Sequence, residues 1–256
     1  TARLAPDWQG CAHPDPDHSW EGGRTQLNGG KCDGFLRSGN NDIFSISYYK
    51  EGDLGFIQNA AKAFTTFDRF HCSLMGSTLP NREYMHAATS YGQRDNDLPI
   101  KDFGFPDTTI FAALDKRGIS NRYYYSDVPF SALWGLKYLG VSQSLEHFFS
   151  DAAAGTLPSV SYVEPALFLE VADGLSNDYH PHGDIRNGEA FLNQIYRAVT
   201  TSPVWSKTVL VFTFDEWGGF FDHVPPTTAP DTNPSVTGLR GFRVPAIVIS
   251  PFAPRQ

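Results

Sequence analysis

The chain has 256 residues, of which 19% are charged and 14% are aromatic, a composition that excludes disordered and fibrous proteins. The net charge of −8 and the isoelectric point near 5.4 argue against general nucleic-acid binding. An anionic substrate stays compatible with this charge, because a bound metal ion inverts the local field. No apolar run approaches about 18 residues, so we expect no membrane-spanning segment.

In chain order, the sequence predicts an α/β fold. Residues 1–42 are rich in Gly, Asp, Pro and Asn, show no sustained period and are expected to form an irregular surface region. Helical periodicity occurs in residues 53–65, 81–90, 108–117, 142–154 and 189–200, and short apolar strands are expected at 122–125, 159–163, 208–214 and 244–250. Strands that alternate with helices predict a single domain, residues 1–256, with a mainly parallel central sheet flanked by helices. The run Val209-Leu210-Val211-Phe212 predicts a strand buried on both faces.

Two adjacent acids follow this apolar strand. Functional sites in parallel sheets collect beyond the carboxyl ends of the strands, which is where Asp215 and Glu216 lie. Neighbouring carboxylates repel each other unless a cation offsets them, and hard divalent cations favour oxygen ligands. Gly218 and Gly219 then let the backbone turn sharply. The alternative is a solvated acidic turn, or a carboxylate that caps a helix.

A second candidate is a hydroxyl at the start of a helix. Ser77 and Thr78 follow Gly76 and precede Pro80 in a segment expected to begin a helix. Backbone N–H groups at a helix N-terminus stabilise an anion such as phosphate, and a hydroxyl there can be activated as a nucleophile. The alternative is that Ser77 or Thr78 is an N-cap and that Pro80 fills the first turn.

Three histidines lie in polar loops, where functional residues concentrate. These are His18, His180 and His182, and histidine in such a place can hold a metal, contact a phosphate oxygen or protonate a leaving group. His13, His71, His86 and His147 are expected to be surface residues. No P-loop pattern, dinucleotide fingerprint or Gly-x-Ser-x-Gly motif occurs in the sequence.

The three cysteines fit no zinc spacing. A Cys11–Cys32 disulfide would suit an oxidising compartment and would leave Cys72 free. The alternative is three small buried side chains.

Four blocks in order resemble the bacterial phosphoesterase family, which holds phosphatidylcholine-type phospholipases C and related acid phosphatases. The blocks are DPDHSWEGGRTQLNGGKCDGF at 15–35, CSLMGSTLPNREYMH at 72–86, YHPHGDIRNGEAF at 179–191 and TFDEWGGFFDHVPP at 213–226. The family is similar in fold to the alkaline phosphatase and sulfatase superfamily. Thr78-x-Pro80-x-Arg82 parallels the sulfatase nucleophile pattern, with threonine in place of the modified cysteine.

The resemblance implies a role for each matching residue. Thr78 would be the nucleophile that forms a phosphothreonine, and Asp215 and Glu216 would hold one divalent metal ion of unknown identity. His18 and His180 would stabilise the phosphoryl group or protonate the leaving group, and His223 would support the same pocket. Asn81, Arg82 and His182 would contact the substrate, while Asp184 would order its loop.

The resemblance also implies a substrate class and a location. The substrate would be a phospholipid or a small-molecule phosphate ester. A phospholipid substrate would be compatible with peripheral contact between the protein and a membrane. The protein would be secreted or periplasmic. Trp217, Phe220, Phe221 and Tyr179 suit a lipid headgroup or an aryl ester equally well. The alternatives are an acid phosphatase of the same family and, from another class, a non-catalytic binding protein that keeps the fold.

One departure from the family pattern concerns the metal site. The family has an early Glu-Asn-Arg-Ser-Phe-Asp-type segment whose Glu and Asn complete the metal site, and this sequence lacks it. The segment that follows the strand ending near Pro251 in the family is missing too. We therefore expect a fragment of a longer chain, with the fold incomplete at both ends.

Overall fold

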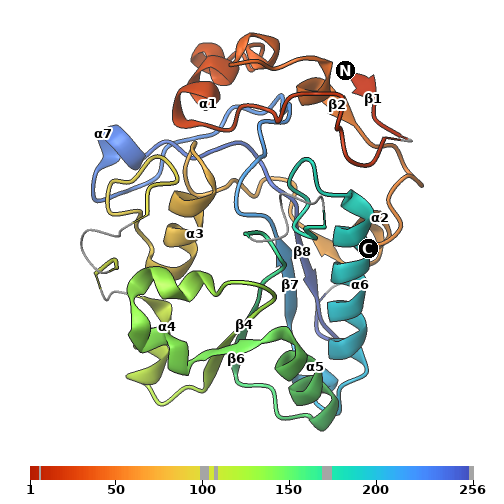
Figure 1. Cartoon of the computed structure of the whole chain (residues 1–256), viewed down its shortest axis with the longest axis vertical. Helices are drawn as coiled ribbons and strands as arrows, with labels where there is room; N and C mark the ends of the chain where they lie inside the picture. Colours follow the sequence, from red (N-terminus) through yellow and green to blue (C-terminus); the bar gives the residue numbers. More distant parts are fainter. Residues whose placement is uncertain (6, 99–103, 107–108, 169–174, 254–256) are drawn as a thin grey trace. The chain divides into compact units, whose positions relative to one another are not determined.

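The computed structural model describes residues 1–5, 7–98, 104–106, 109–168 and 175–253 (Figure 1). The chain divides into two compact units, and each is built from separate segments of the sequence. Unit 1 contains Thr1–Leu54, Thr65–Asp97 and Val211–Ile247, and unit 2 contains Gly55–Phe64, Leu98–Leu210 and Val248–Gln256. The segments interleave along the chain, so no linker marks a border between the units.

Unit 2 contains a parallel sheet. Strands β4 (Asn121–Tyr125), β5 (Ser142–Ser144) and β6 (Val160–Val163) pair in the order β5-β4-β6. Helices α4 (Ile110–Asp115) and α5 (Leu145–Ala154) contact β4, and α5 also contacts α6 (Ile185–Thr200), as the lower half of Figure 1 shows. The parallel α/β arrangement predicted from the alternating elements is confirmed. Thr108, the first residue of one expected helix, lies outside the described residues.

Helix α6 has the clearest sequence signal and a second role in packing. Its buried residues Phe191, Ile195 and Val199 lie four apart on one face, as predicted. Glu189 is also buried, and its carboxylate accepts the backbone N–H groups of Phe56 and Ile57, where α2 (Ile57–Ala63) begins. A negative charge at this helix end satisfies donors that the helix itself leaves unpaired.

Unit 1 carries most of the predicted site residues. Its helices are α1 (Trp20–Leu27), α3 (Thr78–Ala87) and the short α7 (Pro234–Thr237). Strands β1 (Ala2–Arg3) and β2 (Ser47–Tyr48) pair in parallel, and β3 (Thr65–Thr66), β8 (Ala246–Ile249) and β7 (Leu210–Thr213) pair in the order β3-β8-β7. The core of this unit is a cluster of buried residues from distant segments: Cys32, Phe35, Cys72, Met75, Trp217, Phe242 and Val244.

Helix α1 contradicts the expectation of an irregular region over residues 1–42. Its buried residues are Trp20, Gly22, Gly23 and Gln26, so its inner face has only one large apolar side chain. This composition hides the helical period, although Ser19 caps the helix by accepting the Gly22 N–H. Gly23 is needed because an added Cβ would lie 2.5 Å from Met75 Cγ. Helix α1 therefore packs closely through glycine, where most helices would use a row of apolar side chains.

Strand β7 also differs from the prediction. Phe212 is buried, but Val209 and Val211 are 59% and 54% exposed, so the apolar run is not buried on both faces. Side chains alternate between the two faces of a strand, and only one face of this run is covered within the described residues. Asp215 and Glu216 still follow the end of the strand, as predicted.

The cysteines are all free, so the Cys11–Cys32 disulfide considered from the sequence does not form. Cys32 and Cys72 are buried in the unit 1 cluster, and Cys11 is exposed. The alternative expectation, that the cysteines are small buried side chains, is confirmed for Cys32 and Cys72 and is wrong for Cys11. In the part of the chain that the structure describes, no helix is both long and apolar enough to cross a membrane.

Helix α3 buries a carboxyl group with no hydrogen-bond partner. Glu83 is 0% exposed, and neither of its carboxyl oxygens has a partner. Burial raises the pKa of Glu83 from 4.5 to about 8, because the charged form loses its hydration. The folded state therefore holds this proton more tightly than the unfolded state does.

We predict that Glu83 makes the protein less stable as the pH rises. A carboxyl whose folded pKa is raised contributes stability below pH 4.5 that is lost as the pH passes through about 8. Glu83→Gln keeps the shape without the charge, so its free energy of unfolding should exceed that of the wild type at pH 9 by as much as about 4 kcal/mol. Urea unfolding at pH 4.5 and pH 9 measures this difference. Equal pH dependence in the two proteins would contradict the burial of an unpaired carboxyl.

Candidate active site

The predicted nucleophile lies at the first turn of α3. Ser77 is in the N-cap position, but its side chain makes no capping hydrogen bond, so the capping alternative does not account for this hydroxyl. Thr78 is the first helical residue, is half-buried, and makes no side-chain hydrogen bond to the described residues. The Leu79 N–H donates to Asn96 Oδ1 at 2.9 Å. The Thr78 hydroxyl is therefore held at the positive end of a helix and is not used in the fold.

Asn81 supports the loop that leads into Thr78. Its Oδ1 accepts the Leu74 N–H at 2.8 Å, and its Nδ2 donates to the carbonyls of Leu74, Gly76 and Ser77 at 2.9–3.1 Å. The side chain is buried, with 2% exposure. The resemblance implied that Asn81 contacts the substrate. In the structure, its side-chain amide hydrogen-bonds to backbone groups of its own loop. Asn81 is a positioning residue for the loop.

Arg82 joins α3 to the acidic turn. It lies four residues after Thr78, on the same helix face, and its Nε donates to Asp215 Oδ2 at 2.9 Å. The Arg82 and Asp215 side chains are 15% and 20% exposed, so solvent screens the pair only in part. The pair directs the helix face that carries Thr78 toward the end of β7.

The acidic turn is well ordered and largely buried. Glu216 is 8% exposed, and its Oε2 accepts the Gly218 N–H at 2.7 Å, while Asp215 Oδ1 accepts the Glu216 N–H at 3.0 Å. These contacts exclude the solvated acidic turn considered from the sequence. Burial, and next the charges of Glu216 and Asp215, raise the pKa of the Cys72 thiol well above its ordinary value. The carboxylates of Glu216 and Asp215 therefore both act on the same region of unit 1.

The loop that carries His18 packs against the glycine turn. Gly219 has φ +70°, and a Cβ there would lie 2.7 Å from the Pro16 carbonyl oxygen. The His18 Nδ1–H donates to the same carbonyl at 2.8 Å, which leaves Nε2 as the lone-pair nitrogen of the neutral ring. Trp217 Nε1 donates to Gln26 Oε1 at 2.8 Å and so ties the turn to α1. Trp217 is a core residue, not a pocket wall.

His223 lies outside this group of residues. Its side chain is 76% exposed, and its Nδ1 is 3.8 Å from Asp222 Oδ1. Asp222 itself is bound by Arg243 at 2.7 Å and orders the segment after Phe221. His223 is therefore a largely exposed side chain, and its support of the pocket stays a prediction.

His180 and His182 belong to unit 2 and are half-buried there. The His180 N–H donates to Asp178 Oδ1 at 3.1 Å. Tyr179 precedes it with φ +69°, and its hydroxyl donates to Glu189 Oε1 at 2.5 Å. Tyr179 thus anchors the loop rather than lining a substrate pocket. Asp184 caps α6 by accepting the Arg186 N–H, as expected for a residue that orders the loop.

The sequence did not reveal the positioning roles of three residues, because their partners are backbone groups or distant side chains. Asn81, Gln26 and Tyr179 fall into this class, and only the glycines beside them signal close packing. The arrangement in unit 1 offers a hydroxyl at a helix N-terminus, a guanidinium on the same face, and two carboxylates, of which Glu216 is buried and Asp215 is partly exposed. These groups suit the transfer of an anionic group to the hydroxyl.

A sequence model described as the phosphoesterase family matches residues 5–255. Non-specific phospholipase C6 of Arabidopsis thaliana is 32% identical over 93% of this chain and 51% of its own length. Phospholipase C A of Mycobacterium tuberculosis is 30% identical over 93% of this chain and 55% of its own length. The chain spans about half the length of the curated relatives it matches. These relatives come from a plant and a bacterium, so the expectation that the family is bacterial was too narrow.

Among solved structures, a protein in the alkaline phosphatase superfamily from Vibrio parahaemolyticus is similar with a TM-score of 0.47 and 13% identity. The similarity covers 78% of this chain and 55% of that chain. A TM-score this low adds no argument, so the α/β assignment rests on the helices and strands described above.

We predict that Gly219 cannot be replaced without moving the His18 loop. Gly219→Ala adds a clash with the 16–17 backbone to the strain of a positive φ, and so should destabilise the protein. Gly29→Ala is the matched control, because Gly29 has φ +66° and no atom within 4 Å of an added Cβ. Thermal unfolding should show Gly219→Ala to be less stable than the control by about 1–3 kcal/mol. Equal losses would contradict the close packing.

Proposed function

Since the chain belongs to the phosphoesterase family, we propose that it hydrolyses phosphate esters through a covalent intermediate on Thr78. The observation that carries this proposal is the Thr78 hydroxyl, which is ordered at the N-terminus of α3 and makes no hydrogen bond within the described chain. A hydroxyl retained there without a structural partner suits a nucleophile.

In the first step, the Thr78 hydroxyl gives up its proton, Oγ1 attacks phosphorus, the bond between phosphorus and the leaving oxygen breaks, and that oxygen takes up a proton to leave as the alcohol. In the second step, the oxygen of a water molecule attacks phosphorus, the bond between phosphorus and Thr78 Oγ1 breaks, and a proton from that water restores the hydroxyl. Both steps place negative charge on the phosphoryl oxygens. The Leu79 N–H is bound by Asn96 and Pro80 has no N–H, so the Thr78 N–H and the positive end of the α3 dipole would offset part of this charge. Arg82 keeps the helix face oriented through Asp215 and adds positive charge beside it.

The leaving alcohol needs a proton, and the histidines are the candidates to supply it. The His18 Nδ1–H is held by the Pro16 carbonyl, so Nε2 is the atom that would carry a transferable proton. His180 is the second candidate, with its backbone held by Asp178. His182 keeps its proposed role as a substrate contact.

Asp215 and Glu216 fit a divalent metal ion by their chemistry, because adjacent carboxylates repel each other, Glu216 is buried, and Arg82 offsets the charge of only one of the two. These two residues would hold the ion, and further ligands would complete its coordination. When bound, such an ion supplies Lewis acidity that makes a coordinated hydroxyl more acidic.

We propose a phospholipase C-type reaction as the activity, because the relatives named above are phospholipases C. The scissile bond would then be the one between phosphorus and the diacylglycerol oxygen. A phosphomonoesterase would use the same groups at Thr78, so the substrate alone distinguishes these two activities.

We predict that Thr78→Ala lowers turnover at least about 100-fold, because the nucleophile is lost. Thr78→Ser should keep measurable activity, since it retains the hydroxyl. Ser77→Ala is the matched control, because it removes a neighbouring hydroxyl that makes no capping bond. The assay follows release of phosphocholine from phosphatidylcholine and of nitrophenol from nitrophenyl phosphate by the intact protein. A fully active Thr78→Ala protein would exclude the proposed nucleophile, and turnover of nitrophenyl phosphate alone would favour the phosphomonoesterase.

We also predict that Asp215→Asn lowers the amount of bound divalent metal, because an amide is a weaker ligand than a carboxylate. Asp222→Asn is the control, since Asp222 is a carboxylate of the same segment that pairs with Arg243. Elemental analysis of the purified proteins measures the metal without relying on activity. Full metal content in Asp215→Asn would remove Asp215 from the proposed site.

A further inference from the structure

A cavity of about 650 Å³ opens in unit 1, on a different face of α3 from Thr78. Its lining includes His71, Ser73, Tyr84, Asp231 and Arg240, and none of the residues assigned above to catalysis. Tyr84 lies six residues beyond Thr78 on α3, a rise of about 9 Å along the helix axis. A cavity of this size suits a small molecule.

One side of the cavity carries the carboxylate of Asp231, whose oxygens already accept hydrogen bonds from the fold. Asp231 Oδ2 accepts the Tyr84 hydroxyl, and Asp231 Oδ1 accepts the Asn233 N–H at 3.0 Å and the Thr237 hydroxyl at 2.7 Å. These contacts, together with the charge of Arg240, outweigh burial and lower the pKa of Asp231. Asp231 therefore stays ionised and has its acceptor sites occupied from within the fold.

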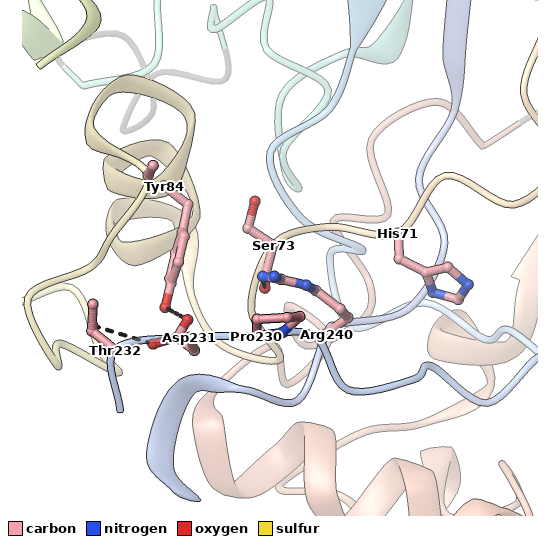
Figure 2. A pocket seen from close by; sticks show the side chains of 8 residues that line it. His71, Ser73, Tyr84, Pro230, Asp231, Thr232 and Arg240 are labelled. Carbon is pink, nitrogen blue, oxygen red and sulfur yellow. Dashed lines mark hydrogen bonds between the residues drawn. The ribbon is translucent and has the colours of Figure 1, made fainter. Parts of the chain in front are cut away.

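The other side of the cavity carries donors that the fold leaves unused. Arg240 donates one N–H to the Ser73 carbonyl, and its side chain makes no other hydrogen bond to the described residues. The Ser73 hydroxyl makes none, and the His71 ring donates from Nδ1 to the Gly241 carbonyl at 3.0 Å, with Nε2 unused. Figure 2 shows the Tyr84–Asp231 pair on one side of the pocket, with Arg240, Ser73 and His71 on the other.

This asymmetry identifies the kind of ligand that the cavity would take. The guanidinium of Arg240 lies 5.8 Å from the centre of the Tyr84 ring and is held in place by Ser73, so it is oriented before any ligand arrives. A planar guanidinium with spare N–H groups, beside a hydroxyl and an imidazole, suits an oxyanion with several acceptor oxygens. The Tyr84 ring and Pro230 offer apolar surface to carbon atoms attached to it.

We propose that this cavity is a second binding site, separate from Thr78, for a soluble phosphate monoester or inorganic phosphate. The same phosphate chemistry occurs in the headgroup of phosphatidic acid. A vesicle experiment separates this lipid-borne phosphate from the soluble one. The site does not depend on Thr78 being a nucleophile.

The test is calorimetric titration of the intact Thr78→Ala protein with inorganic phosphate and with phosphocholine. Arg240→Gln should weaken binding at this site at least about 10-fold, because a charge-assisted contact is lost. Ser73→Ala, which removes a hydroxyl with no role in the fold, should weaken it about 3-fold or more and covers the case in which Arg240→Gln misfolds. Arg37→Gln is the matched control, since it removes the same charge from an exposed side chain elsewhere in unit 1.

Unchanged phosphate binding in folded Arg240→Gln or Ser73→Ala would overturn the proposal, as would no saturable binding below about 10 mM phosphate. Sedimentation with phosphatidylcholine vesicles, with and without phosphatidic acid, forms the lipid arm. Arg240-dependent binding to the phosphatidic acid vesicles, without binding of inorganic phosphate, would overturn the soluble ligand. These outcomes are independent of the activity of Thr78→Ala, so failure of the cavity and failure of the nucleophile are distinguishable.

Discussion

The ion pair between Arg82 and Asp215 is the contact on which the candidate site depends. It joins the helix that begins at Thr78 to the turn that follows β7. Both partners are largely shielded from solvent, so the pair is oriented by its surroundings as well as by charge. The contact links the helix that carries the Thr78 hydroxyl to the turn that carries Asp215 and the buried Glu216.

Most of the fold was predictable where the apolar pattern follows the geometry of the element. Helix α6 shows this, since Phe191, Ile195 and Val199 repeat with the period of the helix and are buried. Helix α1 was missed because its buried face contains Gly23 and Gln26, which carry no apolar signal. The exposure of Val211 could not be predicted either, because an apolar run shows what can be buried and not what covers it.

The family and the segments of the site were predictable, because four blocks in order resemble one family and its model matches nearly the whole chain. The roles within those blocks were less predictable. The amide of Asn81 binds its own loop, and His223 is exposed although it follows the acidic turn closely. Such roles depend on which backbone groups lack a partner after folding, and a linear sequence does not contain that information.

The four backbone contacts of Asn81 have a consequence for genetic screens. A substitution there would release the loop from Leu74 to Ser77 and so displace the Thr78 hydroxyl without touching a substrate. In a screen scored only by growth or colour, such a variant would be indistinguishable from a loss of the proposed nucleophile. Position 81 would then be counted among the chemical residues, although its contribution is architectural.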